Sequence, residues 1–343
     1  MPSRRRFLAS MGAAAAAVGL AGCSGSGGRS PPHEAWPYDP RAALGLDLPW
    51  RGFVSVDVPR AWARREQLPE EWVATVTSFD RGVTSVDRGD LDRLTAQGFG
   101  TADLTTAGTT VALTGDIEAR PVVREFAQGS TVEEHEPVAG HRLFGYEPRF
   151  LGRIDRNGEL TSGSLGLAVA DGRAVAGGLL AREERAVDSV AAMVRARAGA
   201  AESEPDRDIR SVGRALAASP LGLPPVAGGV TFDRALASRL SGAIPEAWPT
   251  LAAAVDDLRA FGVGLRFGPD RTLTEFVFVY DPRAIAENEN LRAAADKLTE
   301  ESDTVDNGVV GVRLGPDGRS LVVRTTVSPQ TVWADFRGEL PGF

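Results

Sequence analysis

The side chains best suited to acid–base chemistry or metal binding in this sequence are its histidines, of which there are three. His135 and His141 lie close together, and Glu133, Glu134 and Glu136 flank the first of them. Imidazole and carboxylate groups are ordinary ligands of zinc and other transition metals. Because the spacing matches no helical or hairpin metal motif, we interpret the pair as histidines on a surface loop and strand, and we predict no metal site.

A hydrolase of the Ser/His/Asp type would also need one of these histidines, since His33 lies in a Pro-rich segment expected to be a linker. Ser164 lacks the first glycine of the GxSxG nucleophile elbow, and we interpret it as part of a small polar loop before a strand. A phosphate-binding GxxxxGK[ST] loop cannot form, because the sole lysine is Lys297. The sequence therefore predicts no catalytic residue and no cofactor.

Two further groups of residues could bind a ligand. Asp87, Asp90 and Asp92 could attract calcium, but they lack the spacing and the glycine of an EF-hand loop, and we interpret them as solvated surface. Four tryptophans could line a ligand groove, although core or rim packing explains them better: Trp62, Trp72, Trp248 and Trp333.

The charge of the chain excludes one class of partner. The formal net charge is -8, and 43% of the residues are hydrophobic, as is usual for a globular protein. Nucleic-acid binding needs clustered positive charge, so we predict no nucleic-acid partner.

The elements that must position these side chains follow from hydrophobic periodicity and turn residues. The hairpin around Asp171-Gly172 has the residues that a type I′ turn prefers, and Val187, Val190 and Val194 mark one face of a helix. Segment 215–229, rich in proline and glycine, is predicted to connect two halves. We predict strands over 52–58, 110–115 and 141–146, hairpins over 165–177, 264–280 and 309–327, and helices over 87–94, 116–126, 183–198, 250–261 and 281–298.

This order of elements predicts an α+β fold with mostly antiparallel sheets. Segments 109–198 and 264–327 each contain a strand, a helix led by aspartate and a hairpin that turns on Asp-Gly. We therefore expect a duplicated topology, with a ferredoxin-like or related sandwich in each half.

The N-terminal residues carry a localisation signal. Arg4 and Arg5 precede an uncharged, Ala-rich stretch that ends in Leu20-Ala21-Gly22-Cys23, and this cysteine is the only one in the chain. These residues resemble a twin-arginine export signal joined to a lipobox, as in prokaryotic lipoproteins. The resemblance implies export of a folded protein, cleavage before Cys23 and attachment of lipid to its thiol. The apolar run is too short to span a bilayer, which needs about 20 residues.

The resemblance also implies a domain organisation and a habitat. Loss of Arg4, Arg5 and Arg6 with the signal would change the net charge from -8 to -11. Acidity and the near-absence of lysine make the chain similar to haloarchaeal lipoproteins, and a GC-rich actinobacterial lipoprotein is the alternative. We predict a signal peptide over 1–22, a lipidated cysteine and Gly/Ser/Pro-rich linker over 23–50, and two α+β halves over 51–215 and 216–343.

We expect a lipid-anchored protein on the extracytoplasmic face of the cell membrane. It would be a non-enzymatic interaction or structural module of the envelope, held by the lipid on Cys23 and bound to an envelope protein. A ligand- or solute-binding lipoprotein is the first alternative. An extracytoplasmic hydrolase that uses His135 or His141 is the second.

Overall fold

The computed structural model describes the parts of the chain that carry most of the predicted hairpins. Arg4, Arg5 and Cys23, and with them the predicted signal peptide, lie outside the described residues, as does the helix predicted over 281–298 apart from Asp281. The described residues are 36–46, 48–68, 73, 84–101, 106–128, 131–146, 153–154, 160–181, 185–199, 207–219, 222–232, 258–268, 272–281 and 309–326.

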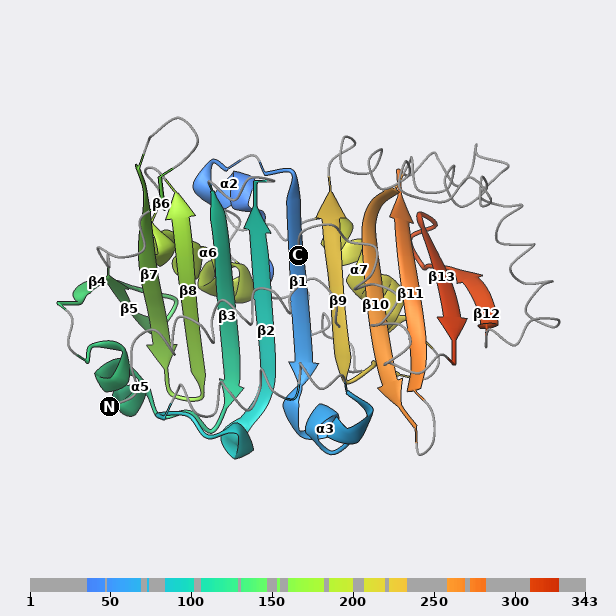
Figure 1. Ribbon diagram of the computed structural model, residues 1–343, viewed down its shortest axis with the longest axis horizontal. Helices are drawn as coiled ribbons and strands as arrows, with labels where there is room; N and C mark the ends of the chain where they lie inside the picture. The colour runs from blue at the N-terminus through green and yellow to red at the C-terminus, as the bar shows by residue number, and fades with distance from the viewer. Residues whose placement is uncertain are drawn as a thin grey trace.

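One antiparallel sheet dominates these residues (Figure 1). Its strands follow the order β12-β13-β11-β10-β9-β1-β2-β3-β8-β7-β5-β4, and β6 pairs with β7. The prediction of an α+β fold with mostly antiparallel pairing is confirmed. The strands are β1 (Trp50–Asp57), β2 (Leu91–Gly100), β3 (Ala107–Gly115), β4 (Glu133–Val138), β5 (His141–Tyr146), β6 (Arg153–Ile154), β7 (Leu160–Ala170), β8 (Arg173–Ala181), β9 (Val226–Phe232), β10 (Leu258–Phe267), β11 (Thr272–Tyr280), β12 (Val309–Leu314) and β13 (Ser320–Thr325).

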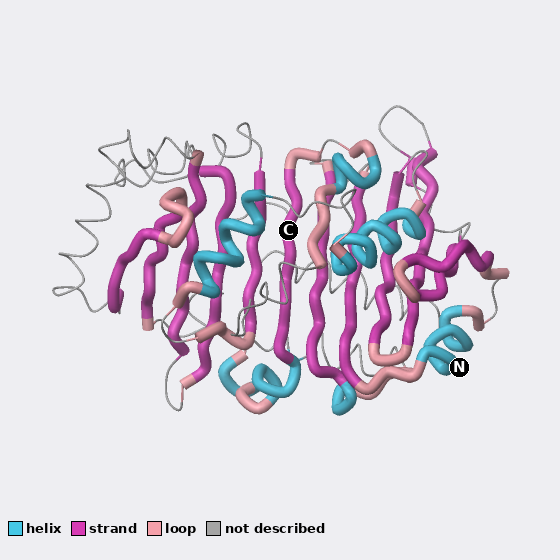
Figure 2. The backbone as a smooth tube through the Cα atoms, turned by 180° about the vertical axis from the view of Figure 1, so that it is seen from behind, coloured by secondary structure: helices cyan, strands magenta, loops and turns pink. Residues whose placement is uncertain are grey.

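Two helices cover one face of the sheet (Figure 2). Helix α6 (Ala186–Ala198) packs on β3, β7 and β8, and α7 (Arg207–Ala217) packs on β9, β10, β11 and β13. The described chain also contains α2 (Pro40–Leu44), α3 (Val58–Trp62), α5 (Ala119–Phe126) and the 3-10 helices η1 (Arg65–Gln67) and η2 (Arg88–Asp90). Within the described residues, no helix is both long and apolar enough to cross a membrane.

Glycines in the sheet allow these helices to approach it closely. A Cβ at Gly262 of β10 would overlap the Cγ1 of Val212 in α7. A Cβ at Gly166 of β7 would lie 2.8 Å from the carbonyl oxygen of Ala186, where α6 begins. The absence of a side chain at these two positions therefore sets the distance between helix and sheet.

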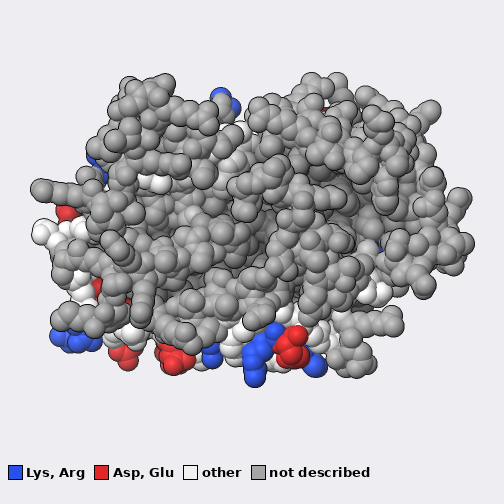
Figure 3. All heavy atoms as spheres, viewed as in Figure 1, with Lys and Arg blue, Asp and Glu red and all other residues white. Residues whose placement is uncertain are grey.

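The turn from β1 into α3 is capped by a side chain. The Asp57 carboxylate accepts the backbone N–H of Arg60 at 3.2 Å and lies 3.6 Å from the guanidinium of Arg93. Along the lower edge of the view in Figure 3, where α3 lies in Figure 1, side chains of both charges are neighbours. Side-chain capping and mixed charge thus end the strand at a polar edge.

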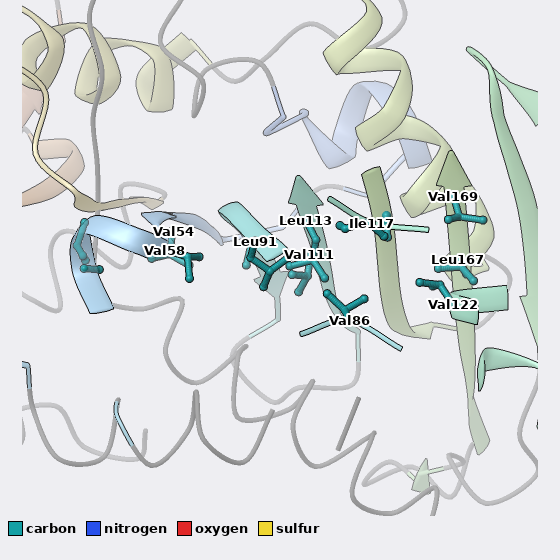
Figure 4. Close-up of a cluster of buried hydrophobic side chains, with 14 of the residues drawn as sticks. Val54, Val58, Val86, Leu91, Val111, Leu113, Ile117, Val122, Leu167 and Val169 are labelled. Carbon is teal, nitrogen blue, oxygen red and sulfur yellow. The ribbon is translucent and has the colours of Figure 1, made fainter. Parts of the chain in front are cut away.

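A hydrophobic cluster that belongs to neither α6 nor α7 joins the two halves of the chain. Val54 of β1 and Leu167 of β7 belong to it, together with Val226 of β9 and Val263 of β10. Figure 4 shows part of the cluster, to which α5 adds Val122. This cluster is therefore shared by both halves, while two other clusters lie under α6 and under α7.

Five strands of each half follow matching orders outward from the centre of the sheet, while the first half adds β5 and β4 beyond β7. Starting from β1, the order is β1-β2-β3-β8-β7, and starting from β9, its neighbour at the centre, it is β9-β10-β11-β13-β12. Both halves contribute these strands to one sheet. The described residues thus form one continuous sheet in place of the expected ferredoxin-like or related sandwich in each half.

Two helices predicted from apolar spacing are strands where the structure describes them. Residues 87–94 form η2 and the start of β2, and Leu258–Phe261 open β10 rather than end a helix. A register shift lies between Leu91 and Arg93, and another between Leu258 and Ala260. Because a bulge changes the alternation of side chains, Leu91 and Leu94 face the same core although they lie three residues apart.

The segment predicted to connect the halves is also structured. It contains the end of α7 and the whole of β9, which pairs with β1 and β10. The prolines and glycines of the segment, among them Gly229, made it resemble a linker. A Cβ at Gly229 would lie 2.9 Å from the Cε1 of Phe53 and 3.1 Å from the Cγ1 of Val212, so the glycine is required by packing.

Candidate functional site

The two histidines lie on neighbouring strands of the sheet, His135 on β4 and His141 on β5. His141 is buried, its Nδ1 lies 3.2 Å from the Ala139 carbonyl oxygen, and burial lowers its pKa. Its Nε2 is buried with no hydrogen-bond partner among the described residues. His135 is partly buried opposite Leu143. Within the described ranges, no group of three or more His, Cys, Asp or Glu side chains could hold a metal.

The glutamates next to His135 lie on the surface. Glu134 accepts hydrogen bonds from the Nε of Arg142 at 2.9 Å and from its Nη2 at 3.2 Å, and this pairing lowers the pKa of Glu134. Glu133 and Glu136 are exposed. These carboxylates therefore line an outer strand of the sheet.

Ser164 has a structural role. It lies within β7, so its prediction as a loop residue was wrong. Its buried hydroxyl accepts the backbone N–H of Ala186 at 2.8 Å. Because the first N–H groups of a helix have no partner within the helix, this contact caps α6 from the sheet.

The acidic and aromatic candidates are surface features where the structure describes them. The Asp87 carboxylate accepts the backbone N–H of Gly89 at 2.7 Å, while Asp90 and Asp92 are exposed. Trp62 lies under the guanidinium of Arg88, 3.9 Å from the ring centroid, which is a cation–π contact. The remaining tryptophans of that group lie outside the described residues: Trp72, Trp248 and Trp333.

A buried polar network fixes the N-terminal end of the described chain to the sheet. The side chain of Gln97 in β2 accepts the backbone N–H of Tyr38 at 2.8 Å and donates to its carbonyl oxygen at 2.6 Å. The Tyr38 hydroxyl hydrogen-bonds the hydroxyl of Ser189 in α6, which in turn lies 2.8 Å from the hydroxyl of Thr110. Complete burial raises the pKa of Tyr38 to about 12.

A second polar network lies beneath α7 and is charged. Its centre is Glu275 of β11, whose side chain is fully buried. Arg266 of β10 forms a hydrogen-bonded ion pair with one carboxylate oxygen. The other oxygen accepts from Arg324 of β13 at 2.9 and 3.2 Å and from the Ser219 hydroxyl at 3.0 Å. We call Glu275, Arg266, Arg313 and Arg324 the Glu275 cluster.

The arginines of the cluster also bind the C-terminal end of α7. Arg313 of β12 donates from Nη2 to the Ala215 carbonyl oxygen at 2.7 Å, and the same nitrogen lies 3.9 Å from Glu275. Arg266 donates to the carbonyl oxygen of Leu216 at 3.5 Å. The last carbonyl groups of a helix lack partners and carry partial negative charge, so cations stabilise this end.

Sequence reasoning missed both networks. The members of the Glu275 cluster come from four strands and are brought together by the sheet. One local signal existed, namely a glutamate in the otherwise uncharged strand Thr272–Tyr280. A charge in such a strand requires partners, because a buried unpaired carboxylate is strongly disfavoured.

Comparison with known proteins gives structural neighbours but no family. No protein-family model matches the chain, and no curated protein matches its sequence. The fold is similar to three crystal forms of TP0453, with TM-scores of 0.44 for form IV and 0.41 for forms III and I. Sequence identities are 10%, 9% and 8%, and each alignment covers 88% of this chain and 98% of TP0453. The function of this chain is therefore inferred from its own residues.

Proposed function

We propose that this chain is a lipid-anchored protein on the extracytoplasmic face of the cell membrane, and that it acts as a non-catalytic interaction or structural module of the envelope. The twin-arginine-like residues Arg4 and Arg5 and the lipobox before Cys23 support the anchor. Two or more lipid chains on that cysteine would give a stable attachment.

The observation that carries this proposal is the way the chain enters the fold. Only residues 24–35 separate Cys23 from Trp36, which is buried. Tyr38 follows and is held by both hydrogen bonds to Gln97 in the middle of β2. A pulling force from a lipid anchor on Cys23 would therefore act on a central strand of the sheet rather than on a surface loop.

We further propose that the two halves arose by duplication of one unit of five antiparallel strands. The matching strand orders support this proposal. The pairing of β1 with β9, where the two halves meet, also supports it. Phe53 pairs with Gly229, and the segments Gly52–Val56 and Gly228–Phe232 run antiparallel. Aligned from their first glycines, these segments read GFVSV and GGVTF.

The anchor is tested by Cys23→Ser in cells, with Ser24→Ala as the matched control. We expect Cys23→Ser to release the protein or to leave an uncut precursor, while Ser24→Ala stays in the membrane fraction. Immunoblots of membrane and soluble fractions, with mass spectrometry of the N-terminal peptide, measure both. Unchanged membrane association of Cys23→Ser would overturn the anchor.

The interaction role is tested by cross-linking in intact cells at native salt, followed by purification of a tagged copy. We expect one recurrent envelope protein in mass spectrometry of the purified material. Recovery of no protein above background would contradict the interaction role and favour the ligand-binding alternative.

A further inference from the structure

The Glu275 cluster contains more positive charge than its own carboxylate can neutralise. Three guanidinium groups lie within 4.0 Å of Glu275, from Arg266, Arg324 and Arg313. Arginine stays protonated in proteins, so the cluster carries two positive charges in excess of its single carboxylate. The excess is not needed to bury Glu275, because Arg266 and Arg324 already hydrogen-bond both of its oxygens.

Arg313 has a hydrogen-bond donor that neither Glu275 nor α7 uses. Its distance of 3.9 Å from Glu275 is an ion-pair distance and too long for a hydrogen bond. Its Nη2 donates to Ala215, whereas its Nε is buried and has no hydrogen-bond partner among the described residues. Burial lowers the pKa of Arg313; the charge of Glu275 opposes this shift, and the nearby charge of Arg324 adds to it. A buried donor without an acceptor is unfavourable, and an anion would supply the acceptor.

The cluster can be reached from solvent on its β12–β13 side. The side chains of Arg313 and Arg324 are 26% and 22% exposed, compared with 10% for Arg266. Arg313 and Arg324 come from the paired strands β12 and β13, at one end of the strand order. A ligand would therefore meet these two arginines first.

We propose that Arg313 and Arg324 form an anion-binding site for a phosphate-type oxyanion. A phosphate-type oxyanion carries negative charge and several acceptor oxygens, which match the two partly exposed guanidinium groups and the buried Nε of Arg313. Its oxygens would accept from the Nε of Arg313 and from the Nη1 of Arg324, since the Nε and Nη2 of Arg324 already donate to Glu275. The site goes beyond the lipid anchor proposed above and does not depend on Cys23.

The test is calorimetric titration of the full chain with inorganic phosphate, at constant ionic strength and about pH 8, where phosphate groups are mainly dianionic. We expect one binding site per chain. Arg313→Gln and Arg324→Gln should each weaken binding by about tenfold or more, the effect of losing a charge-assisted hydrogen bond. Arg142→Gln is the matched control, since this exposed arginine pairs with Glu134 on β4.

The variants decide between a binding site and a purely structural cluster. Failure of the wild-type chain to bind phosphate, or equal affinities in all three variants, would overturn the proposal. Urea unfolding shows that each variant is folded. If Arg324→Gln does not fold, Arg313→Gln alone tests the site. In Arg313→Gln, Glu275 keeps its hydrogen bonds to Arg266 and Arg324.

A second measurement identifies the source of the phosphate. Sedimentation with phosphatidylglycerol vesicles, with and without inorganic phosphate, separates a lipid headgroup from a free ion. Vesicle binding that phosphate displaces and Arg313→Gln removes would support the site with a headgroup as its ligand. Phosphate binding without vesicle binding would support it with a soluble phosphate.

Discussion

The polar groups buried beneath α6 are neutral, whereas those beneath α7 are charged. Under α6, Tyr38, Gln97 and Ser189 satisfy one another by hydrogen bonds. Under α7, Glu275 is surrounded by arginines that reach it from neighbouring strands. In the chain α6 follows β8 whereas α7 precedes β9, but both helices cover the same face of the sheet. The two networks therefore occupy the same layer, between a helix and the sheet.

The difference separates two uses of buried polarity. A neutral network is complete when each donor has an acceptor, and beneath α6 it holds the N-terminal segment in place. An ionic network also has to balance charge, and the Glu275 cluster does not do so with its own residues. We therefore expect the network beneath α6 to attach the N-terminal segment to the sheet, and the Glu275 cluster beneath α7 to bind an anion.

The largest expected effect is that of Glu275→Ala. This change leaves three arginines without their shared carboxylate, and we expect the free energy of unfolding to fall by about 3–5 kcal/mol, as when one partner of a buried ion pair is removed. Urea unfolding followed by circular dichroism measures the loss. A loss below about 1 kcal/mol would show that the cluster is solvated, and the contrast between the halves would fail.

The next effect concerns the contact between α7 and the sheet. Gly262→Ala places a methyl group on Val212, and we expect a loss of about 1–3 kcal/mol from overpacking. Gly178→Ala is the matched control, since its Cβ would lie 3.5 Å from the nearest atom, an ordinary contact. Equal stabilities of the two variants in thermal unfolding would mean that α7 does not depend on this close approach.

Tyr38→Phe tests the neutral network and should cost about 1 kcal/mol near neutral pH, the net value of a buried hydrogen bond. The folded-state pKa of Tyr38 is raised from 10.0 to about 12. The stability that this group contributes is thus fully present below pH 10 and is lost as the pH rises towards 12. Unfolding measured across that range should show a steeper loss in the wild type than in Tyr38→Phe. Parallel curves would place the Tyr38 hydroxyl in contact with solvent.

The smallest effect is expected for the exposed pair on β4 and β5. Arg142→Gln removes the partner of Glu134, and surface ion pairs contribute about 0–1 kcal/mol. The measurement is the midpoint of urea unfolding. A loss comparable to that of Glu275→Ala would contradict the view that burial, and not pairing as such, makes the α7 network important.

Prediction from the sequence was most accurate where structure depends on neighbouring residues. The hairpin around Asp171-Gly172 and the helix containing Val190 were predicted and are present. Leu91 and Leu94 misled the prediction, because a bulge in β2 gives a strand the spacing of a helix. Gly229 misled it in β9, because a glycine required by packing looks the same in sequence as one in a linker.

The sequence by itself determined the hairpins and the antiparallel α+β class, since these depend on residues close together in the chain, and the signal with Cys23 stays a prediction. Tertiary structure decided that β1 and β9 join the halves into one sheet and that Glu275 gathers Arg266, Arg313 and Arg324. The physical reason is that strand pairing and charge pairing act between groups close in space, whatever their separation along the chain.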